Sequence, residues 1–355
     1  MGEPRAVAAE APEPEAPLAL TMGEPAGIGG EIALAAWRRR NDDGLTPFFA
    51  IDDPARLRAL AGRLGWDVPV EEIAAPRDAR GVFSRALPVL AEALAAPVTR
   101  GQPDPANAPA VIRAIDRAVE LVRSGDAAAV VTNPIAKAVL YDSGFDHPGH
   151  TEYLAELARD GGPAPVPVMM LACPLLRVVP VTIHVPLREV PQRLDRRLIE
   201  HAGRVTAAAL RRDFEVAAPR LAVTGLNPHA GEGGAIGREE IEVIGPALET
   251  LRAEGLEVRG PVSADTLFHA EARAGYDAAL CMYHDQALIP IKALDFARGV
   301  NVTLGLPFVR TSPDHGTAFA LAGTGRADPT SLIEALKLAR RMAEGRARNA
   351  AAAAV

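Results

Sequence analysis

The strongest constraint on the fold is a series of short apolar segments that alternate with longer segments of helical periodicity. Seven short segments are rich in β-forming residues, and several are apolar throughout: 18–21, 48–51, 128–132, 178–184, 221–226, 278–283 and 300–305. Strands of this kind are typical of a sheet that helices cover on both faces. Four longer segments carry apolar residues at helical spacing: 107–123, 192–212, 238–253 and 330–345. The sequence therefore predicts an α/β protein.

The chain is long enough for two packed lobes, since it has 355 residues, of which 48% are hydrophobic. No long low-complexity linker divides it, so we expect the chain to cross between the lobes more than once. One lobe is predicted to hold residues 17–150 and 305–345, and the other residues 151–304. Segments 1–16 and 346–355 have little to bury and are predicted to be tails, the first of them disordered.

Charge and composition narrow the class of partner. The 38 Lys and Arg residues are outnumbered by 45 Asp and Glu, so there is no basic excess for nucleic acid, which is not an expected partner. No apolar run reaches the roughly 18 residues of a membrane span, and the N-terminus does not read as a signal peptide, so no membrane partner is expected. Cys173 and Cys281 lie in apolar runs, which predicts buried free thiols and a cytoplasmic location.

Three of the eight histidines lie at or just beyond the carboxyl ends of predicted strands: His184, His229 and His284. Ligand sites of open α/β sheets form at these ends. Neutral imidazole is a common ligand of Zn²⁺ and similar metals, and three protein ligands leave a catalytic metal an open position. The long spacings carry no local signature, so polar residues satisfied in loops remain the alternative.

Two glycine-rich loops could approach a ligand closely. Segment 227–237 holds His229 beside four glycines, although a mobile loop would look the same. Segment 21–31 follows the first predicted strand and opens a helix, whose N-terminus could receive an anion. Its glycines do not form the dinucleotide fingerprint GxGxxG, and tight-turn packing is the alternative.

A third group of polar residues suits a phosphate or a carboxylate. His150 and Thr151 precede a helical segment, where Thr151 could cap the helix or contact a substrate. Lys292, Asn301 and Arg310 lie in the segments that follow His284. Arg310 can bind an oxyanion through two hydrogen bonds and Lys292 supplies a compact charge, although solvated surface cations are the commoner case.

Eight segments, in this order, together resemble the 4-hydroxythreonine-4-phosphate dehydrogenase family of vitamin B6 biosynthesis: TMGEPAGIGGE, TNPIAKA, PGHTE, VTIHVPL, LNPHAGEGGAIG, GPVSADTLF, MYHDQALIPIK and GLPFVRTSPDHGTA. The resemblance covers about residues 17–345. It implies a two-lobed α/β/α fold similar to that of isocitrate and isopropylmalate dehydrogenases, with the active site in the cleft between the lobes.

The resemblance also implies roles for individual residues. His184, His229 and His284 match the divalent-metal ligands (Zn, Mg or Co), the first two from one subunit and the third from its partner in a homodimer. The matches to substrate contacts are His150, Thr151, Lys292, Asn301 and Arg310. Asp265 lies in a further family motif, and Lys292 and Asp265 are the candidates for the group that takes the hydroxyl proton.

The implied reaction is oxidation of 4-phosphooxy-L-threonine by NAD to a β-keto acid, which loses CO₂ to give 3-amino-2-oxopropyl phosphate. NADP use remains open. Relatives with the same histidines that oxidise 4-phospho-D-threonate, the erythronate or an aromatic dihydrodiol dicarboxylate are the alternative. A non-catalytic phospholigand-binding protein is the alternative from another class.

Overall fold

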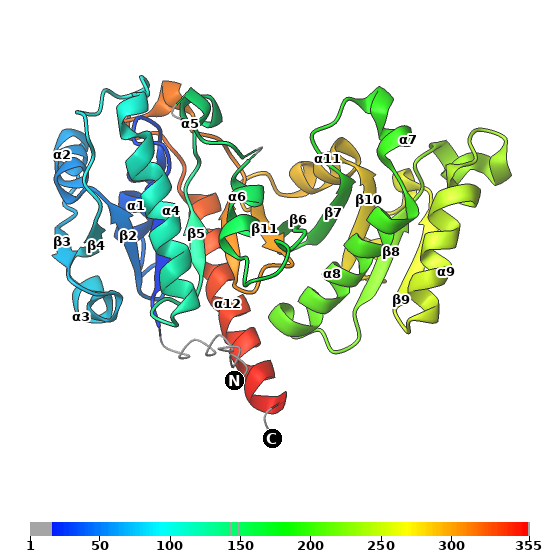
Figure 1. The fold of residues 1–355 in the computed structure, drawn as a ribbon. Helices are drawn as coiled ribbons and strands as arrows, with labels where there is room; N and C mark the ends of the chain where they lie inside the picture. The colour runs from blue at the N-terminus through cyan, green and yellow to red at the C-terminus, as the bar shows by residue number, and fades with distance from the viewer. Residues whose placement is uncertain (1–15, 143, 148, 354–355) are drawn as a thin grey trace, which may run out of the picture. The chain divides into compact units, whose positions relative to one another are not determined.

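A computed structural model of the protein describes residues 16–142, 144–147 and 149–353. Two compact units divide these residues (Figure 1). Unit 1 holds the described residues up to Pro165 and those from Pro307 onward, and unit 2 is Val166–Leu306. Of the segment predicted as a disordered tail, all but Ala16 lies outside the described residues.

Unit 1 is built on a parallel sheet whose strand order is β3-β4-β2-β1-β5-β12. Its strands are β1 (Leu18–Thr21), β2 (Phe48–Asp52), β3 (Val70–Ile73), β4 (Leu87–Ala91), β5 (Val130–Thr132) and β12 (Arg310–Pro313). Its α-helices are α1 (Gly29–Arg38), α2 (Pro54–Leu64), α3 (Ala79–Phe83), α4 (Ala108–Arg123), α5 (Lys137–Asp142), α6 (His150–Leu157) and α12 (Thr330–Ala353). Short 3₁₀ turns lie at Pro76–Asp78, Pro105–Asn107 and Phe319–Leu321.

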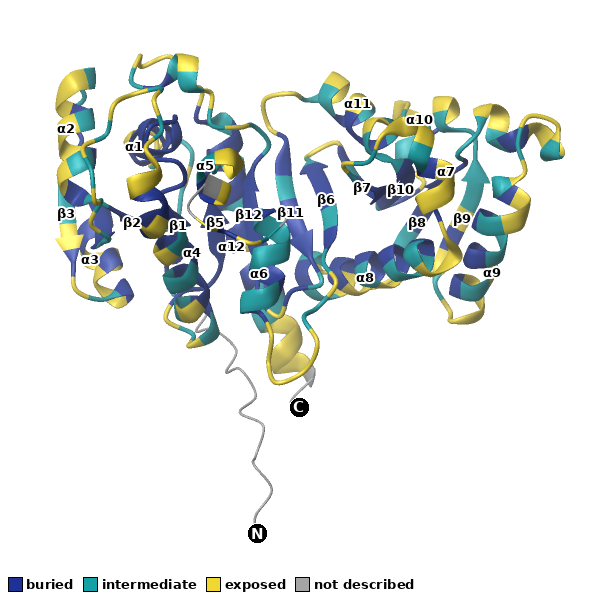
Figure 2. Ribbon diagram, turned by 45° about the horizontal axis from the view of Figure 1, so that its top comes forward, coloured by how far each residue is buried: buried dark blue, intermediate teal, exposed yellow. Residues whose placement is uncertain are grey.

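The central strands of unit 1 are buried on both sides because helices cover both faces. Every residue of β1, β2 and β5 is buried, as the dark strands of Figure 2 show. In Figure 1, α4 lies in front of these strands and α12 behind them. The helical spacing of apolar residues over 107–123 becomes the buried stripe of α4. The prediction of an α/β protein is therefore confirmed.

Unit 2 is built on a mixed sheet with the order β11-β6-β7-β10-β8-β9. The pairs β11/β6 and β6/β7 are antiparallel, and the remaining pairs are parallel. Its strands are β6 (Val168–Cys173), β7 (Leu176–Thr182), β8 (Arg220–Thr224), β9 (Glu257–Val262), β10 (Ala278–Tyr283) and β11 (Val300–Leu304). Its α-helices are α7 (Val190–Arg193), α8 (Arg196–Phe214), α9 (Gly245–Ala253), α10 (Ala270–Arg273) and α11 (His284–Leu294). A π-helical turn, Glu240–Ile244, precedes α9, and 3₁₀ turns lie at Leu187–Glu189, Pro228–Gly234 and Ala264–Thr266.

One core cluster of unit 2 lies between α11 and its sheet. Ala279 and Cys281 alternate along β10 and pack with Ala287 and Ile291 of α11. Cys281 is a buried free thiol, as expected, and burial raises the pKa of that thiol above its usual range. Cys173 is also free but only partly buried.

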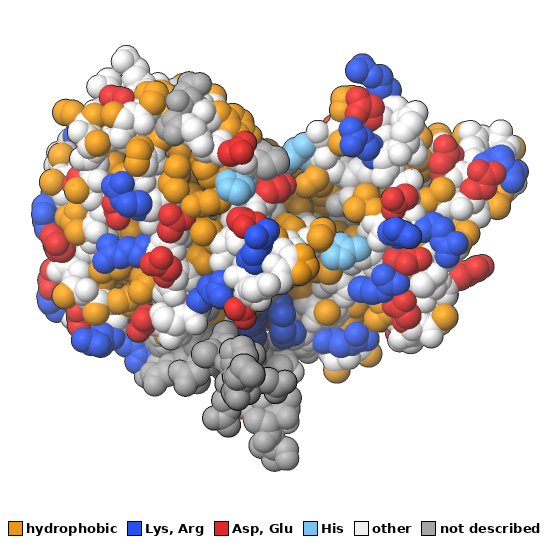
Figure 3. Space-filling model, viewed as in Figure 1, with side chains coloured by type: hydrophobic (Ala, Val, Ile, Leu, Met, Phe, Trp, Pro, Cys, Tyr) orange, Lys and Arg blue, Asp and Glu red, His pale blue; other side chains and the backbone are white. Residues whose placement is uncertain are grey.

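The end of the chain differs from the expected tail. Residues 346–353 continue α12, because alanine is the strongest helix former and five alanines lie within this stretch. Among the described residues, no helix is long and apolar enough to cross a membrane. On the face drawn in Figure 3, acidic and basic side chains are interspersed, and neither sign of charge covers it.

Candidate functional site

Three neighbouring parallel strands of unit 2 each lead into a histidine. His184 follows β7, His229 follows β8, and His284 is the first residue of α11, directly after β10. These strands lie side by side in the order β7-β10-β8, so their carboxyl ends share one edge of the sheet. The His184 and His284 rings lie 5.7 Å apart, centroid to centroid. A cavity of about 230 Å³ lies beside these two rings and is also lined by Thr182, Val185, Leu187, Val190, Tyr283 and Asp285.

Two of these histidines have left-handed backbone conformations, with φ of 52° at His184 and 51° at His229. Residues with a side chain adopt such conformations at a cost, and they persist only where the surrounding structure holds them. His229 begins a run of six residues with positive φ that ends at Gly234. Such strain concentrates at ligand sites.

The glycine-rich loop 227–237 is organised by a buried carboxylate, that of Glu240. This side chain is 5% exposed and accepts hydrogen bonds from the amides of Leu226 and Asn227, both at 2.8 Å. It also accepts one from the Asn227 side chain at 3.0 Å. A Cβ on Gly231 would lie 2.5 Å from the Glu240 carboxylate, so only glycine fits there. The loop that carries His229 is therefore held in one conformation, which argues against the mobile-loop alternative.

The carboxamide of Gln286 ties the strand ends together. Its oxygen accepts hydrogen bonds from the Thr224 hydroxyl and the Met282 amide, both at 2.7 Å. Its nitrogen donates to the Gly225 carbonyl at 2.8 Å. Gln286 thus fixes the start of α11, and with it His284, to the end of β8.

The donor set suits a divalent metal. Nδ1 of His284 lies 2.7 Å from a carboxylate oxygen of Asp285, which can only accept, so the Nε2 lone pair is left to bind a metal. His184 presents a second imidazole beside it. Among the described residues of one chain, no group of three histidine, cysteine or carboxylate side chains is close enough to hold a metal ion. The histidines are therefore of the right chemical type to bind a metal. The described residues of one chain do not bring three such ligands together.

Asp265 lies in the exposed turn Ala264–Thr266, close enough to His229 for an electrostatic interaction. The Ser263 hydroxyl donates a hydrogen bond to its carboxylate and, with the smaller effect of His229, holds the pKa of Asp265 below its usual value. Lys292 lies in α11 with its Nζ 5.4 Å from the Phe296 ring centroid. Asn301 lies in β11, opposite Leu171 of β6.

The other candidate residues form a cationic cluster in unit 1. Arg310 is 4% exposed and donates to the Thr132 hydroxyl from Nε and Nη2, at 3.2 and 2.7 Å. Burial lowers the pKa of Arg310 to about 10, so it stays charged at neutral pH. His150 is the first residue of α6, close enough to Arg310 and Lys137 for electrostatic interaction. Thr151 does not cap this helix, because α6 begins at His150 and its N-cap is Gly149.

His150 is held neutral in this cluster. Its Nε2 is buried and has no hydrogen-bond partner among the described residues. Burial, together with the charges of Arg310 and Lys137, holds the pKa of His150 well below its ordinary value of 6.5. A buried, unpaired ring nitrogen beside two cations is suited to an anionic or hydroxyl-bearing ligand.

The depressed pKa of His150 predicts a loss of stability in mild acid. Below pH 6.5 the unfolded chain binds a proton at this position that the folded chain does not, so the free energy of unfolding falls as pH decreases. We expect His150→Gln to show a shallower fall than the wild type in urea unfolding midpoints at pH 7.5, 6.5 and 5.5. His201→Gln, at a half-buried position of α8, is the control and should follow the wild type. Parallel curves for His150→Gln and the wild type would contradict the assignment.

Comparison with known proteins identifies the family. A sequence profile described as "Pyridoxal phosphate biosynthetic protein PdxA" matches residues 45–339. The chain belongs to this family. This match confirms the family that the eight motifs predicted. It also confirms the prediction of an oxidoreductase.

Several PdxA relatives cover nearly the whole chain. A 4-hydroxythreonine-4-phosphate dehydrogenase from Methylorubrum populi is 61% identical over 94% of this chain and 96% of its own. A solved 4-hydroxythreonine-4-phosphate dehydrogenase from Klebsiella pneumoniae has a TM-score of 0.82 at 36% identity, covering 92% of this chain and 99% of its own. A terephthalate 1,2-cis-dihydrodiol dehydrogenase from Burkholderia xenovorans has a TM-score of 0.62 at 28% identity, covering 92% and 98%.

In this PdxA family member, the loop 21–31 is not an open anion site. A Cβ on Gly23 would lie 2.6 Å from the Pro134 carbonyl oxygen, and one on Gly29 2.8 Å from that of Met22. The N-terminal turns of α1 are buried, and the Arg56 guanidinium lies 3.1 Å from the Cβ position on Gly30. These glycines therefore serve close packing, which was the alternative considered from the sequence.

Sequence reasoning did not single out Glu240, Gln286 or Lys137. The signal for Lys137 was its place in TNPIAKA, directly after a buried strand. Glu240 and Gln286 gave no signal of their own, because each acts through backbone groups that only the folded loops bring together.

Proposed function

We propose that the protein oxidises 4-phosphooxy-L-threonine with NAD, giving 2-amino-3-oxo-4-phosphooxybutanoate, which loses CO₂ to form 3-amino-2-oxopropyl phosphate on the route to pyridoxine 5′-phosphate. The observation that carries the proposal is the 61% identity, over almost the whole chain, to a relative named for this activity. The three histidines at neighbouring strand ends support it, because their chemistry suits the metal that such a reaction uses.

When bound, a divalent metal (Zn, Mg or Co) supplies Lewis acidity at the reacting oxygen, and the nicotinamide accepts the hydride. His184, His229 and His284 would hold the metal. Asp285 orients the His284 ring through its Nδ1, and Glu240 holds the loop that presents His229. These contacts keep the imidazoles in place before any ligand arrives.

The substrate's anionic groups are matched by the remaining candidates. Arg310 offers a rigid guanidinium whose burial strengthens a hydrogen bond to phosphate or carboxylate. His150 is neutral and can hydrogen-bond a ligand without adding charge. Thr151, Lys292 and Asn301 complete the proposed contacts, which orient the reacting carbon. Lys292 and Asp265 remain the two candidates for the proton acceptor.

The proposal includes a homodimer in which the partner completes each metal site. One support is that the described residues of a single chain do not bring three metal donors together. The other is the apolar surface of α11 and of the residues that follow it. There Ile289 is 65% and Phe296 76% exposed, on the same segment as His284. Exposed apolar side chains of this size are typical of surfaces that another protein covers. The pairing of His184 with His229 in one subunit stays a prediction, as do the active-site cleft between the lobes and the cytoplasmic location.

A second candidate function is oxidation of a related diol, such as 4-phospho-D-threonate, the erythronate or an aromatic dihydrodiol dicarboxylate. The observation that favours it is the likeness to a solved dihydrodiol dehydrogenase at 28% identity. The alternative from another class is a non-catalytic protein that binds a metal and a phosphorylated ligand. In such a protein the same residues would bind these ligands without a reaction. NADP is the alternative to NAD as hydride acceptor.

The test is NADH formation by the purified protein with 4-phosphooxy-L-threonine, with and without a chelator. We expect turnover that a chelator abolishes and that added divalent metal restores. Turnover of 4-phospho-D-threonate alone would favour the second candidate. Absence of metal-dependent turnover with every one of these substrates would overturn the dehydrogenase proposal.

A further inference from the structure

Helix α6, which begins with His150 and Thr151, has little of its own to fix its first turn. It is eight residues long, and helices this short are marginal unless tertiary contacts hold them. Its N-cap is Gly149, which offers no capping side chain. Its buried residues, Leu154 and Ala155, belong to the second turn. The position of the His150 ring therefore depends on what the rest of the first turn contacts.

One such contact is a hydrogen bond between Tyr153 of α6 and Asp116 of α4. The Tyr153 hydroxyl donates to a carboxylate oxygen of Asp116, and both side chains are half-buried. Within the described chain no cation pairs with Asp116, whereas Glu120, four residues along α4, repels its charge. Burial raises the pKa of Tyr153, so the hydroxyl keeps the proton that it donates. Hydrogen bonds to a carboxylate are roughly twice as strong as those between neutral groups.

The ring of Tyr153 holds the chain that leads into α6. Its centroid lies 4.9 Å from that of Phe145 and 4.9 Å from that of His147, and the Phe145 and His147 centroids are 5.2 Å apart. Aromatic rings at these separations attract each other beyond the effect of the apolar area that they bury. Tyr153 therefore contacts the segment before His150 through its ring, and α4 through its hydroxyl.

Asp116 belongs to the same framework as Arg310. It lies near the middle of α4, a 16-residue helix that packs against β1, β2 and β5. β5 carries Thr132, whose hydroxyl accepts two hydrogen bonds from Arg310. Figures 1 and 2 both show α6 beside α4. The bond between Tyr153 and Asp116 thus ties the helix of His150 to the helix and strand that hold Arg310.

The His150 ring needs such a tie, because its buried Nε2 has no hydrogen-bond partner among the described residues. Its position is then set by the backbone that carries it. His150 and Tyr153 are three residues apart, which makes them neighbours on one side of α6. A shift of α6 would move Nε2 relative to Arg310, and a misplacement of roughly 1 Å in a reacting site can cost about 100-fold in rate.

We propose that Asp116 and Tyr153 are positioning residues, whose hydrogen bond holds His150 and Thr151 beside Arg310 for binding of the substrate's anionic group. The inference rests on the proposed function, which assigns that group to these residues. Asp116 and Tyr153 act through α6 and do not contact the ligand themselves.

The first test is Tyr153→Phe, which keeps the ring contacts of Tyr153 and removes only the hydroxyl. We expect the KM for 4-phosphooxy-L-threonine to rise about tenfold while kcat and the KM for NAD stay unchanged, because binding is lost equally in the ground state and the transition state. The affinity for inorganic phosphate, measured by calorimetry, should fall by a similar factor. A lower melting temperature with both quantities unchanged would show a purely structural role and refute the inference.

Phosphate binding needs no turnover, so it separates this inference from the proposed function. A protein without dehydrogenase activity whose phosphate affinity falls in Tyr153→Phe would retain the positioning role. A protein with full activity and a phosphate affinity that ignores the change would retain the proposed function and lose the positioning role.

Variants of Asp116 test whether the two side chains act as a pair. Asp116→Asn keeps an oxygen that accepts from Tyr153 and should retain most of the phosphate affinity, whereas Asp116→Ala should match Tyr153→Phe. The Tyr153→Phe, Asp116→Ala double variant should bind phosphate no more weakly than either single variant. Wild-type affinity in Asp116→Ala, beside weak binding in Tyr153→Phe, would make the Tyr153 hydroxyl a direct ligand contact and contradict the inference.

Arg123→Met is the matched control, since Arg123 ties the opposite end of α6 to α4. Its guanidinium donates to the carbonyls of Leu157 and Arg159, at 2.8 and 3.1 Å. We expect this variant to lose stability without a change in KM or in phosphate affinity, because His150 lies at the other end of the helix. An equal loss of phosphate affinity in Arg123→Met and Tyr153→Phe would point to general loosening of α6 and exclude a specific role for the pair.

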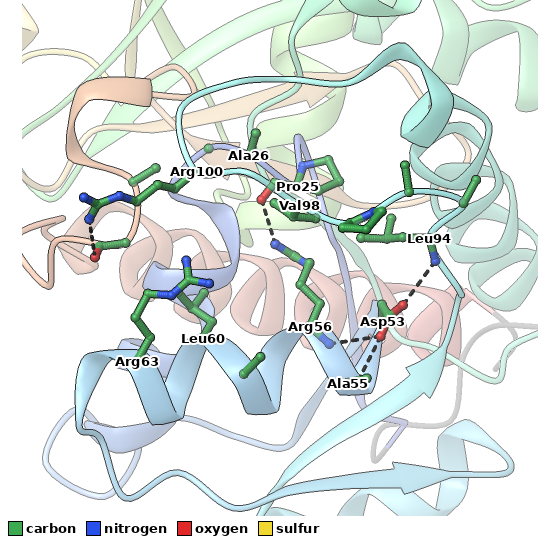
Figure 4. A pocket seen from close by; sticks show the side chains of 17 residues that line it. Pro25, Ala26, Asp53, Ala55, Arg56, Leu60, Arg63, Leu94, Val98 and Arg100 are labelled. Carbon is green, nitrogen blue, oxygen red and sulfur yellow. Dashed lines mark hydrogen bonds between the residues drawn. The ribbon is translucent and has the colours of Figure 1, made fainter.

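Two exposed cations elsewhere in unit 1 would also attract phosphate. Arg63 and Arg100 line a cavity of about 450 Å³ whose walls come from α2 and the loop after β1, and which neither His150 nor Tyr153 lines (Figure 4). The phosphate titrations are therefore made in an Arg63→Gln, Arg100→Gln background, whereas turnover is measured without these two changes. A tenfold loss on adding Tyr153→Phe to that background is the expected result, and no loss there would overturn the inference.

Discussion

Replacing His284 by alanine is expected to remove the bound metal and to lower turnover of 4-phosphooxy-L-threonine by about 1,000-fold or more. The physical reason is that three ligands are the minimum set of a catalytic metal site, and loss of metal assistance costs several kcal/mol in the transition state. A 1,000-fold loss corresponds to about 4 kcal/mol. Metal content after dialysis, measured by atomic emission, and NADH formation together check the expectation.

Two further variants separate a ligand from a residue that orients it. Asp285→Asn keeps the His284 ring but weakens its Nδ1 contact, so metal affinity should fall by about 10- to 100-fold and added metal should rescue turnover. His201→Ala removes a half-buried histidine of α8, outside the proposed site, and should retain both metal and activity. Full metal content in His284→Ala would exclude His284 as a ligand.

Replacing Glu240 by alanine is expected to lower the free energy of unfolding by about 3–5 kcal/mol and to abolish metal binding. The change leaves the amides of Leu226 and Asn227 and the Asn227 side chain without their acceptor in a site that is 5% exposed. The left-handed run at His229 then loses the group that holds it. Urea unfolding measures the first effect, and metal titration the second.

The matched control is Glu242→Ala, because Glu242 belongs to the same turn but is exposed and forms an ion pair with the surface residue Arg238. Its removal should change stability by no more than about 0.5 kcal/mol. If Glu240→Ala retained wild-type metal affinity, Glu240 would be a structural residue with no part in presenting His229.

The central strands were predictable from the sequence because burial on both faces makes them continuously apolar. This holds for β1, β2, β5, β7, β8, β10 and β11, each of which overlaps a predicted strand. Two strands were missed although they are apolar, β4 (LPVLA) and β6 (VMMLAC). The other missed strands lack that pattern. β3 (VEEI) and β9 (EVRGPV) are sheet edges that carry charged residues, and β12 (RTSP) is polar but buried. Nothing local marks such segments as strands.

The site was predictable only in part, because the sequence does not show the order of the strands in the sheet. Each candidate metal ligand could be placed at a strand end, since apolar runs precede His184, His229 and His284. Which of them become neighbours depends on the order β7-β10-β8, in which β10 separates β7 from β8. This order puts His284 next to His184 within one chain. Sequence spacing carries no information about it.

Unit 1 is assembled from both ends of the described chain, whereas unit 2 is a single continuous segment, Val166–Leu306. A ribosome therefore delivers all of unit 2 before β12 and α12 can join unit 1. The Arg310–Thr132 contact joins residues 178 positions apart and forms only after that. A chain arrested after unit 2 would carry His184, His229 and His284 but lack Arg310, the guanidinium proposed to bind the substrate anion.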